Sequence, residues 1–333
     1  MVTVALDAMG GDYSPEEIIK GAFDALKKDK DINVILVGKK EVLEKKVSDE
    51  FADRCECVYS SEVITNEEAP VAAIRAKKDS SIVVGMNLVK EGKADGFVSA
   101  GSTGAVLVGG QLIVGRIKGV LRPALAPLIP TEKGVSLLID CGANVDARSE
   151  HLVQFAKMGS IYMEKVFGIN KPKVGIVNIG AEEEKGNALV KETFPLLKMS
   201  KDINFIGSVE AREIPSGDCD VIVCEAFTGN VILKLYEGVG KTLLSEIKSA
   251  LTEGFITKIG ALLIKSALKS KLKKFDTSEQ GQGGAPMLGL KGLVIKAHGN
   301  SKASEISKAI LQCISFDEQN ITSLIEESML KAE

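Results

Sequence analysis

The chain has 333 residues, of which 45% are hydrophobic and 26% are charged, and its formal net charge at pH 7 is −3. This composition is typical of a globular protein large enough to bury a substantial core. The slightly negative charge argues against a general nucleic-acid-binding protein. Only two histidines are present, which excludes a metal centre built from several histidine ligands.

The six cysteines include no C-x-x-C pair, and Cys55 and Cys57 are too closely spaced for an ordinary zinc site. We expect reduced and mostly buried thiols, as in a cytoplasmic protein. The first residues show no basic segment followed by an apolar stretch. No apolar run approaches the roughly 18 residues needed to cross a bilayer. The sequence therefore predicts a cytoplasmic location and leaves contact with a membrane surface open.

Short runs rich in valine and isoleucine alternate with helical patterns along most of the chain. The first strand is expected at 2–6, followed by a glycine turn and a helix from 15 to about 28. Further strands are expected at 33–37, 96–100, 135–140, 174–179, 204–206 and 221–224. This alternation predicts a three-layer α/β/α fold with a mostly parallel sheet. Because ligands bind at the carboxyl ends of such strands, the glycine-bearing turns are candidate sites.

Residues 241–274 differ from the rest of the chain. Eight lysines against two glutamates give this segment a local net charge of +6, and its apolar residues recur close to helical spacing. Gly254 and Gly260 are expected to divide it into two short helices. We therefore expect a protruding basic amphipathic helical hairpin within a single domain that spans 1–333.

The first glycine turn, DAMGGD at 7–12, follows the first predicted strand. Gly10 and Gly11 permit positive φ angles and a close approach of the backbone to a ligand. Asp12 can cap the helix that follows. Taken alone, this pattern is better explained by a plain strand–turn–helix connection than by a binding site.

The second glycine turn, SAGSTGA at 99–105, opens another predicted helix. Two small glycines, the hydroxyls of Ser102 and Thr103 and free backbone N–H groups meet there at a helix start. Such an arrangement suits an oxyanion such as phosphate. Ordinary helix capping accounts for the two hydroxyls as well, so this turn alone also decides nothing.

The combination of motifs is more specific. Ten short segments occur in a fixed order: DAMGGD at 7–12, SAGSTGA at 99–105, VGRIKG at 114–119, RPALAP at 122–127, DCGANVD at 140–146, EHLVQ at 150–154, KGN at 185–187, FIG at 205–207, FTGN at 227–230 and KAHG at 296–299. Together they closely resemble the phosphate acyltransferase (PlsX) family of bacterial phospholipid synthesis. The resemblance extends from residue 4 to about residue 326.

That resemblance implies a homodimer with a fold like that of the isocitrate and isopropylmalate dehydrogenases. It implies the transfer of a fatty acyl group from acyl carrier protein to inorganic phosphate, without a cofactor. The acyl phosphate product is then used by a glycerol-3-phosphate acyltransferase.

One segment, 220–234, also resembles the metal-binding stretch of the decarboxylating dehydrogenases. Asn230 and Lys234 occupy the places where those enzymes have aspartates, and their spacing of four puts them on one helix face. Replacing two anionic oxygen ligands with an amide and an ammonium removes a magnesium site. We therefore expect no metal here and an anionic substrate instead.

The chemistry expected of this family requires few groups. Phosphate is already a nucleophile, and a thiol with a pKa of about 8.5 can leave as the thiolate. By the resemblance, Lys185 and Asn230 are the expected catalytic residues. Lys185 is expected to neutralise either the phosphate or the oxyanion, and Asn230 to donate to the carbonyl oxygen. A surface lysine and a simple helix cap are the alternative explanations. An acyl-enzyme on Cys141, Cys219 or Cys224 is not needed.

The remaining expected site residues are assigned to substrate binding. The two turns supply walls for phosphate and for the pantetheine arm, and other polar residues follow predicted strands. The full set is Asp7, Gly10, Gly11, Asp12, Gly101, Ser102, Thr103, Gly104, Asn144, Asp146, Lys234 and His298.

Three interpretations stay open for the basic hairpin: contact with an anionic membrane, contact with the acidic acyl carrier protein, or packing against the core or the second subunit. The membrane interpretation uses Leu251, Phe255, Ile259, Leu262 and Leu263 with Lys258, Lys265 and Lys269. Alternatives for the whole protein are an acyl-CoA-dependent phosphate acetyl- or butyryltransferase, a metal- and NAD-dependent dehydrogenase, and a non-catalytic membrane adaptor.

Overall fold

The computed structural model describes residues 1–46, 49–272 and 283–331. Within them, seven strands form a first sheet in the order β3-β2-β1-β4-β12-β11-β5. Their bounds are β1 Val2–Asp7, β2 Ile32–Gly38, β3 Cys55–Tyr59, β4 Gly96–Ser99, β5 Ala124–Leu125, β11 Ala285–Leu288 and β12 Leu293–Lys296. The five strands from β3 to β12 run parallel, whereas β11 is antiparallel to both of its neighbours.

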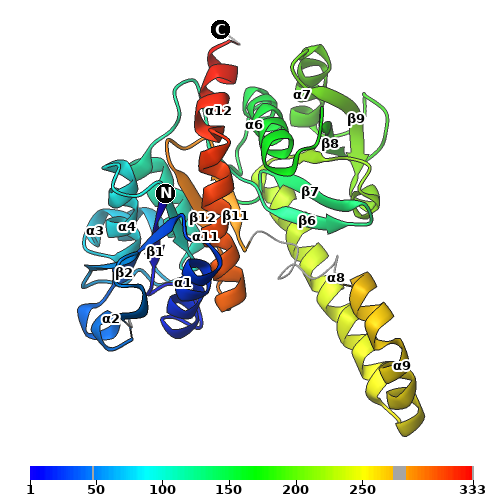
Figure 1. The fold of residues 1–333 in the computed structure, drawn as a ribbon. Coiled ribbons are helices and arrows are strands. Elements are labelled where there is room, and N and C mark those ends of the chain that lie inside the picture. The colour runs from blue at the N-terminus through cyan, green and yellow to red at the C-terminus, as the bar shows by residue number, and fades with distance from the viewer. Residues whose placement is uncertain (47–48, 273–282, 332–333) are drawn as a thin grey trace.

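A second sheet of five strands has the order β6-β7-β10-β8-β9. Its strands are β6 Leu128–Thr131, β7 Gly134–Ile139, β8 Lys173–Asn178, β9 Asn204–Glu210 and β10 Val221–Val223. All of its pairings are parallel except that of β6 with β7. The predicted α/β class with mostly parallel strands is therefore confirmed, with the strands divided between two sheets (Figure 1).

Helices cover both faces of each sheet. The helices of the first half are α1 Glu16–Lys28, α2 Lys40–Lys46, α3 Pro70–Ala76, α4 Ser81–Lys90 and α5 Thr103–Gly109. Those of the second half are α6 Ser149–Phe167, α7 Ala188–Met199, α8 Ala226–Thr252, α9 Phe255–Leu272, α11 Ala303–Glu318 and α12 Ile321–Leu330. Short turns of helix occupy Asp49–Phe51 and Ala211–Ser216, and a π-helical segment, Gly110–Val114, continues α5.

The alternation of side chains along β1 explains its two helical layers. Val4 and Leu6 pack into the core cluster beneath α1 and α11, whereas Ala5 belongs to the cluster on the α4 side. Because successive strand residues point to opposite faces, a strand buried on both faces must be apolar throughout. The cluster that holds Leu6 also holds Leu137 and Val221 of the second sheet, so one apolar core joins the two sheets.

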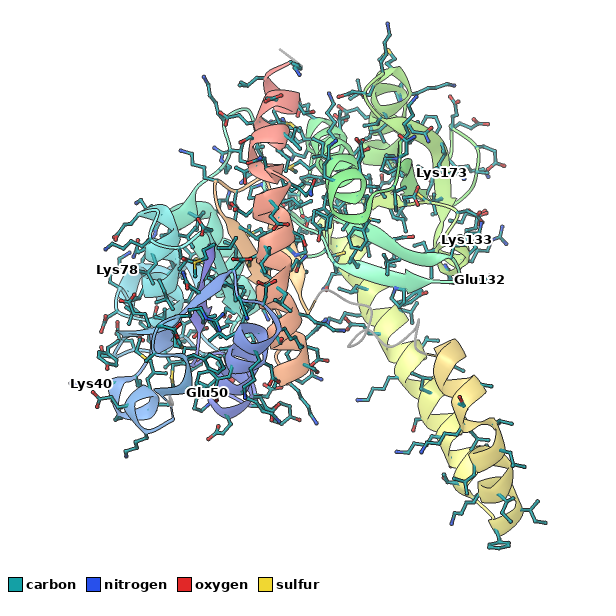
Figure 2. The ribbon with its side chains drawn as sticks, in the orientation of Figure 1. Lys40, Glu50, Lys78, Glu132, Lys133 and Lys173 are labelled. Atoms are coloured by element: carbon teal, nitrogen blue, oxygen red, sulfur yellow. The ribbon has the colours of Figure 1, made fainter. Side chains whose placement is uncertain are left out.

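Charged side chains lie on the outside of this core. Lys40, Lys78, Lys133 and Lys173 are exposed and point away from the body of the molecule (Figure 2). Buried carboxylates and ammonium groups are costly unless they are paired or hydrogen-bonded, so the few charged groups that the fold does bury need such partners.

The predicted hairpin protrudes from the body, as Figure 1 shows. It is formed by the distal part of α8 and by α9, which pack side by side. Two details of the prediction were wrong. The first helix begins at Ala226, where Glu225 caps it by accepting from the backbone N–H of Phe227 at 2.6 Å. Gly260 lies inside α9, so the only break falls between Thr252 and Phe255 among the described residues.

Candidate functional site

The chain changes direction across the first sheet at β1. The connection from β1 leads to β2 on one side, whereas β4 and then β12 lie on the other side. Such a switch point leaves a crevice at the carboxyl ends of the two central strands, where ligands bind in α/β folds. Here the switch point lies between β1 and β4, and both of the glycine turns that the sequence singles out follow these two strands. We call the region at the carboxyl ends of these strands the crevice.

The Asp7 side chain connects the two glycine turns through hydrogen bonds. Its buried carboxylate accepts hydrogen bonds from Ser99 Oγ at 2.7 Å and from the Met9 N–H at 3.1 Å. Ser99 Oγ in turn accepts from the Gly101 N–H at 3.0 Å. Burial raises the pKa of Asp7, and hydrogen bonds from Ser81 and Ser99 oppose this shift. The Asp7 carboxylate therefore organises the floor of the crevice, and its described hydrogen bonds all go to the protein.

Gly10 has no room for a side chain. A Cβ atom there would lie 2.4 Å from Asp7 Oδ2 and 2.6 Å from the Gly101 nitrogen. Gly11 has a φ of 102°, which favours glycine. The Asp12 N–H donates to the Gly299 carbonyl at 2.7 Å and leaves the Asp12 side chain exposed. The first turn is thus held against both β4 and the loop after β12.

The contacts of the second glycine turn give less support to its predicted role in substrate binding. Ser102 precedes α5 and makes no side-chain capping bond, and its side chain is buried, whereas Thr103 is exposed. A Cβ atom at Gly104 would lie 2.4 Å from Pro70 Cγ. Helix packing therefore explains the glycine at 104, although the sequence assigns it to the substrate pocket.

Lys296 ends β12, beside Ser99 in the register of the sheet. Its ammonium donates to the Ala100 carbonyl at 3.4 Å and also to the Ala297 carbonyl, and the residue is 8% exposed. Burial lowers the pKa of Lys296 to about 8, opposed by Asp7 and Asp12 and reinforced by Lys234. Residue patterns alone did not select Lys296, although it begins the KAHG motif that contains His298.

One face of α8 closes the crevice from the side of the second sheet. Asn230, Lys234 and Glu237 lie three and four residues apart and so share that face. The Glu237 carboxylate bridges Lys234 Nζ at 3.0 Å and His298 Nε2 at 3.6 Å. Partial loss of solvent lowers the pKa of His298, and Glu237 opposes this shift. Lys234 and His298, each predicted to bind substrate, are therefore brought together by a glutamate that the sequence patterns did not indicate.

The neighbouring residues of α8 fix its position on the second sheet. Tyr236 donates its hydroxyl hydrogen bond to the Pro130 carbonyl of β6. A Cβ atom at Gly229 would lie 2.0 Å from the Asp140 carbonyl oxygen, so the first turn of α8 packs directly on the backbone after β7. Because of these contacts, Lys234 and Glu237 are carried at a fixed position between the two sheets.

Lys185 lies in the loop after β8, beside the strand that leads into α8. Asn178 holds this loop: its Nδ2 donates to the Lys185 carbonyl at 3.3 Å and to Ser208 Oγ at 3.0 Å. The side chains of Lys185 and Asn230 are exposed. In the described part of the chain, no hydrogen bond or ion pair joins the two, or joins either of them to the Lys234–Glu237–His298 group.

Asn144 and Asp146 follow β7 but are placed differently. Asn144 Nδ2 donates to the Pro123 carbonyl and to Asp140 Oδ2, both at 2.8 Å. Its carbonyl accepts from the Ala226 N–H at the start of α8. The Asn144 side chain is therefore occupied in joining the turn to the protein. Asp146 is exposed.

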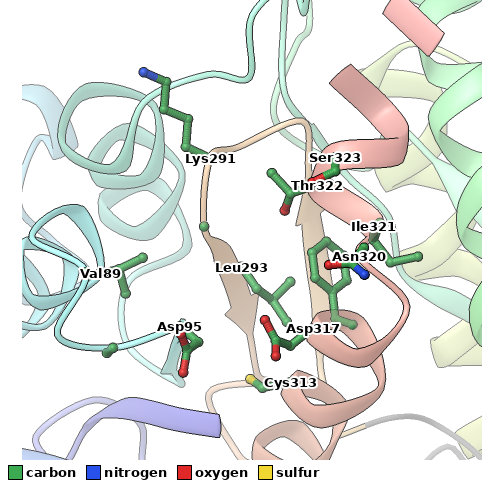
Figure 3. Close-up of a pocket in the computed structure, with 14 residues that line it drawn as sticks. Val89, Asp95, Lys291, Leu293, Cys313, Asp317, Asn320, Ile321, Thr322 and Ser323 are labelled. Carbon is green, nitrogen blue, oxygen red and sulfur yellow. The ribbon is translucent and has the colours of Figure 1, made fainter. Parts of the chain in front are cut away.

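A pocket of about 310 Å³ lies at the other end of the strands, beside the amino ends of β4 and β12 (Figure 3). Asp95 precedes β4, Lys291 precedes β12, and Asp317 and Asn320 belong to the junction of α11 and α12. This pocket contains none of the residues selected from the sequence. Because ligands of parallel sheets bind at carboxyl ends, we place the functional site at the crevice and not at this pocket.

The residues selected for membrane contact all fall on the hairpin. Phe255 and Leu263 are 80% and 82% exposed, and Ile259 and Leu262 are also exposed. Leu251 is half-buried, and Lys258 and Lys265 are exposed. The side chain of Lys269 and residues 273 and 274 lie outside the described part of the chain.

Neither a membrane-spanning helix nor a cluster of metal-binding side chains is present among the residues that the structure describes. None of their helices is long and apolar enough to cross a membrane. Their histidine, cysteine, aspartate and glutamate side chains form no group of three or more that could hold a metal ion.

Comparison with known proteins identifies the family. The family model described as "Fatty acid synthesis protein" matches residues 2–324. The phosphate acyltransferase of Thermoanaerobacter pseudethanolicus is 52% identical over 326 residues, which cover 98% of this chain and 97% of that protein. The phosphate acyltransferase of Clostridium acetobutylicum is 48% identical over 332 residues, which cover 98% of each.

Solved structures with the same fold are more distant in sequence. A phosphotransacetylase from Streptococcus pyogenes superposes with a TM-score of 0.63 at 19% identity, covering 95% of this chain and 94% of that one. A branched-chain phosphotransacylase from Enterococcus faecalis V583 gives 0.58 at 14% identity, covering 95% and 98%. These two likenesses concern the fold alone. The close relatives confirm the resemblance carried by the ten motifs, and the chain belongs to the phosphate acyltransferase family.

Proposed function

We propose that the protein transfers a long-chain acyl group from acyl carrier protein to inorganic phosphate. The observation that carries the proposal is the presence of two lysines, the buried Lys296 and Lys234 of α8, whose charges act on each other beside the two glycine turns. Cationic side chains beside open backbone suit a small, doubly charged anion. Family membership supports phosphate as the acyl acceptor.

In the proposed reaction, a phosphate oxygen attacks the thioester carbonyl carbon directly. A carbon–oxygen bond to phosphate forms, the carbon–sulfur bond breaks, and the electron pair leaves with sulfur as a thiolate. Holding the two reactants together can lower the barrier by about 7–11 kcal/mol. Asn230 would donate to the developing oxyanion and Lys185 would neutralise its charge, in line with their places at the start of α8 and after β8.

The cysteines support direct attack over an acyl-enzyme. Burial raises the pKa of Cys219 to about 12, and it raises the pKa values of Cys141 and Cys224 well above their ordinary range. A buried thiol that does not ionise is a poor nucleophile. We therefore propose that no covalent intermediate forms on these residues and that no cofactor takes part.

The test is the release of free carrier-protein thiol from long-chain acyl carrier protein, with and without inorganic phosphate. Phosphate-dependent release, with the product trapped as a hydroxamate, is the expected result. Thiol release that does not depend on phosphate would indicate a thioesterase. Activity confined to short-chain acyl-CoA would favour the acetyl- or butyryltransferase, and no turnover with either donor would favour the membrane adaptor.

We further propose that the hairpin binds an anionic membrane surface from the cytoplasmic side. The exposed apolar residues at its tip and its lysines support this, since both apolar burial and basic charge favour such binding. Phe255→Glu with Leu263→Glu should abolish flotation with anionic phospholipid vesicles. Ser245→Glu with Ser249→Glu adds the same charge to exposed positions of α8 and should weaken flotation much less. Equal losses would indicate charge alone and would count against insertion of the tip.

The other expected partners are also proposals. Phe227, Val231, Leu235, Val239, Leu243 and Ile247 are exposed at a spacing of four along α8, which supports pairing with a second copy of the chain. Light scattering of Leu235→Glu should then show a monomer. The hairpin lysines would also attract the acidic carrier protein, and a glycerol-3-phosphate acyltransferase would consume the labile product. If turnover at saturating phosphate does not fall as salt rises, the carrier-protein contact is excluded.

A further inference from the structure

Lys296 is a buried cation that neither the sequence pattern nor the family comparison assigns to a role. It lies at the carboxyl end of β12, one strand from Ser99 and two strands from Asp7. Removing an ammonium group from water is costly unless other groups replace its hydration. If the side chain at this strand end only had to fill space in the core, an apolar residue would do so at a lower cost in free energy.

The hydrogen bonds of Lys296 are incomplete. An ammonium has three N–H donors, and those of Lys296 that the structure accounts for go to the carbonyls of Ala100 and Ala297. Of the described carboxylates, none lies within ion-pair distance of its Nζ, although Asp7 and Asp12 are near enough to act on its charge. The buried ammonium is thus held in place by neutral carbonyls and keeps capacity for one further acceptor.

The surroundings of Lys296 indicate what that acceptor is. The carbonyl of Ala100 belongs to the second glycine turn, and the loop after Lys296 contacts the first turn through the bond from Asp12 to Gly299. Lys234, which α8 carries, is near enough for its charge to act on Lys296. Two ammonium groups drawn to one crevice repel each other, and a dianion between them would turn this repulsion into attraction.

We propose that Lys296 is the buried phosphate-binding cation of this site, which holds the acceptor phosphate at the carboxyl ends of β1, β4 and β12. Lys234 of α8 faces it from the other side and is linked through Glu237 to His298 of the loop after β12. The inference rests on the proposed function, because it takes the acceptor to be inorganic phosphate. It assigns ground-state binding of phosphate to Lys296 and leaves the reacting carbonyl to Asn230.

The titration of Lys296 is consistent with this role. Asp7, Asp12, Lys234 and His298 are the ionisable groups that face its ammonium, and burial is the main reason why its pKa lies near 8. A bound dianion would raise that pKa again. The KM for phosphate should therefore rise several-fold between pH 7.5 and pH 9.0, while kcat at saturating phosphate changes much less.

The experiment compares Lys296→Met with the matched control Lys291→Met. Lys291 is exposed at the other end of the same strand, beside the pocket of Figure 3. Initial rates of thiol release are measured against phosphate concentration. Loss of a charge-assisted hydrogen bond should raise the KM for phosphate by about 10- to 100-fold in Lys296→Met, with little change in the control. An unchanged KM in a folded Lys296→Met protein would overturn the proposal.

A second variant keeps the proposal testable if Lys296→Met does not fold. Lys296→Arg keeps the positive charge and titrates far above pH 9, so it should retain phosphate binding and lose the rise of KM between pH 7.5 and 9.0. A rise as large as in the wild type would contradict the proposal. If the wild type itself shows no phosphate-dependent release, the proposed function fails. Calorimetric titration of both Lys296 variants with inorganic phosphate then decides the role of Lys296 separately.

Discussion

The two sides of the crevice are built in different ways. On the first sheet, Asp7, Ser99 and Lys296 are buried and hydrogen-bonded to the backbone of the turns that they support. On the second sheet, the side chains of Lys185 and Asn230 are exposed. A binding site for a small anion must be in place before the ligand arrives, whereas groups needed in the transition state can take their partner from the substrate. We infer that the buried side binds and the exposed side reacts.

The largest expected effect is a loss of kcat when the exposed residues Lys185 and Asn230 are replaced. Lys185→Ala and Asn230→Ala should each lower kcat by about 10²–10³, as for the loss of one oxyanion donor, with small changes in the KM for phosphate. The control is Lys191→Ala, an exposed lysine on α7. Near-wild-type turnover of both variants in folded protein would remove the catalytic assignment.

The floor of the buried side can be disturbed by a single methyl group. Gly10→Ala would place a Cβ atom 2.4 Å from Asp7 Oδ2, so the two turns must move apart. We expect at least a tenfold higher KM for phosphate and a loss of about 1–3 kcal/mol in the free energy of unfolding. Gly240→Ala, inside α8, has open space around its Cβ position. It should leave the KM unchanged and raise the free energy of unfolding by up to about 1 kcal/mol. A normal KM in Gly10→Ala would mean that this floor is not part of the phosphate site.

Burial of Lys296 should also appear in the dependence of stability on pH. Its pKa falls from 10.5 to about 8 on folding, so between these values the unfolded chain binds more protons and stability rises with pH. From pH 7.5 to 9.5 this group should add about 2 kcal/mol to the free energy of unfolding. Denaturant titrations of wild type and Lys296→Met give the difference between the two pH profiles. Parallel profiles would show that the ammonium is not desolvated.

The smallest expected effect concerns the link across the crevice. Glu237→Gln keeps the shape of the side chain but removes the charge that opposes the lowered pKa of His298. The pKa of His298 should therefore fall further, and kcat/KM should decrease a few-fold because Lys234 also loses its partner. Titration of the two imidazoles by NMR measures this shift, with His151 as the internal control. An unshifted His298 would mean that the bridge does not persist in solution.

Local sequence patterns predicted the parts of the fold that depend on local physics. Each predicted strand is present within a few residues of its expected bounds, because valine- and isoleucine-rich runs suit strands buried on both faces. Gly10, Gly11 and Asp12 lie at the crevice because they follow a central strand. Strands β3, β5, β6, β11 and β12 were not among the predicted strands. Three of these are short or contain proline, which weakens the periodic signal.

The residues that were missed depend on contacts between distant parts of the chain. Lys296 lies between two apolar neighbours in a strand, and no sequence pattern indicates that its ammonium reaches the crevice. Glu237 meets His298 only because α8 is packed between the sheets. Gly260 did not break α9, because packing against α8 offsets the roughly 1 kcal/mol by which a glycine weakens a helix.

The single continuous helix α8 fixes the distance between the crevice and the far end of the hairpin. Lys234 lies at the crevice and Thr252 near the end of the hairpin, so a rise of about 1.5 Å per residue separates them by about 27 Å. Both ends belong to one helix that Tyr236 attaches to β6. The length of this helix therefore acts as a spacer: whatever surface the hairpin touches, the crevice is kept within about 27 Å of it.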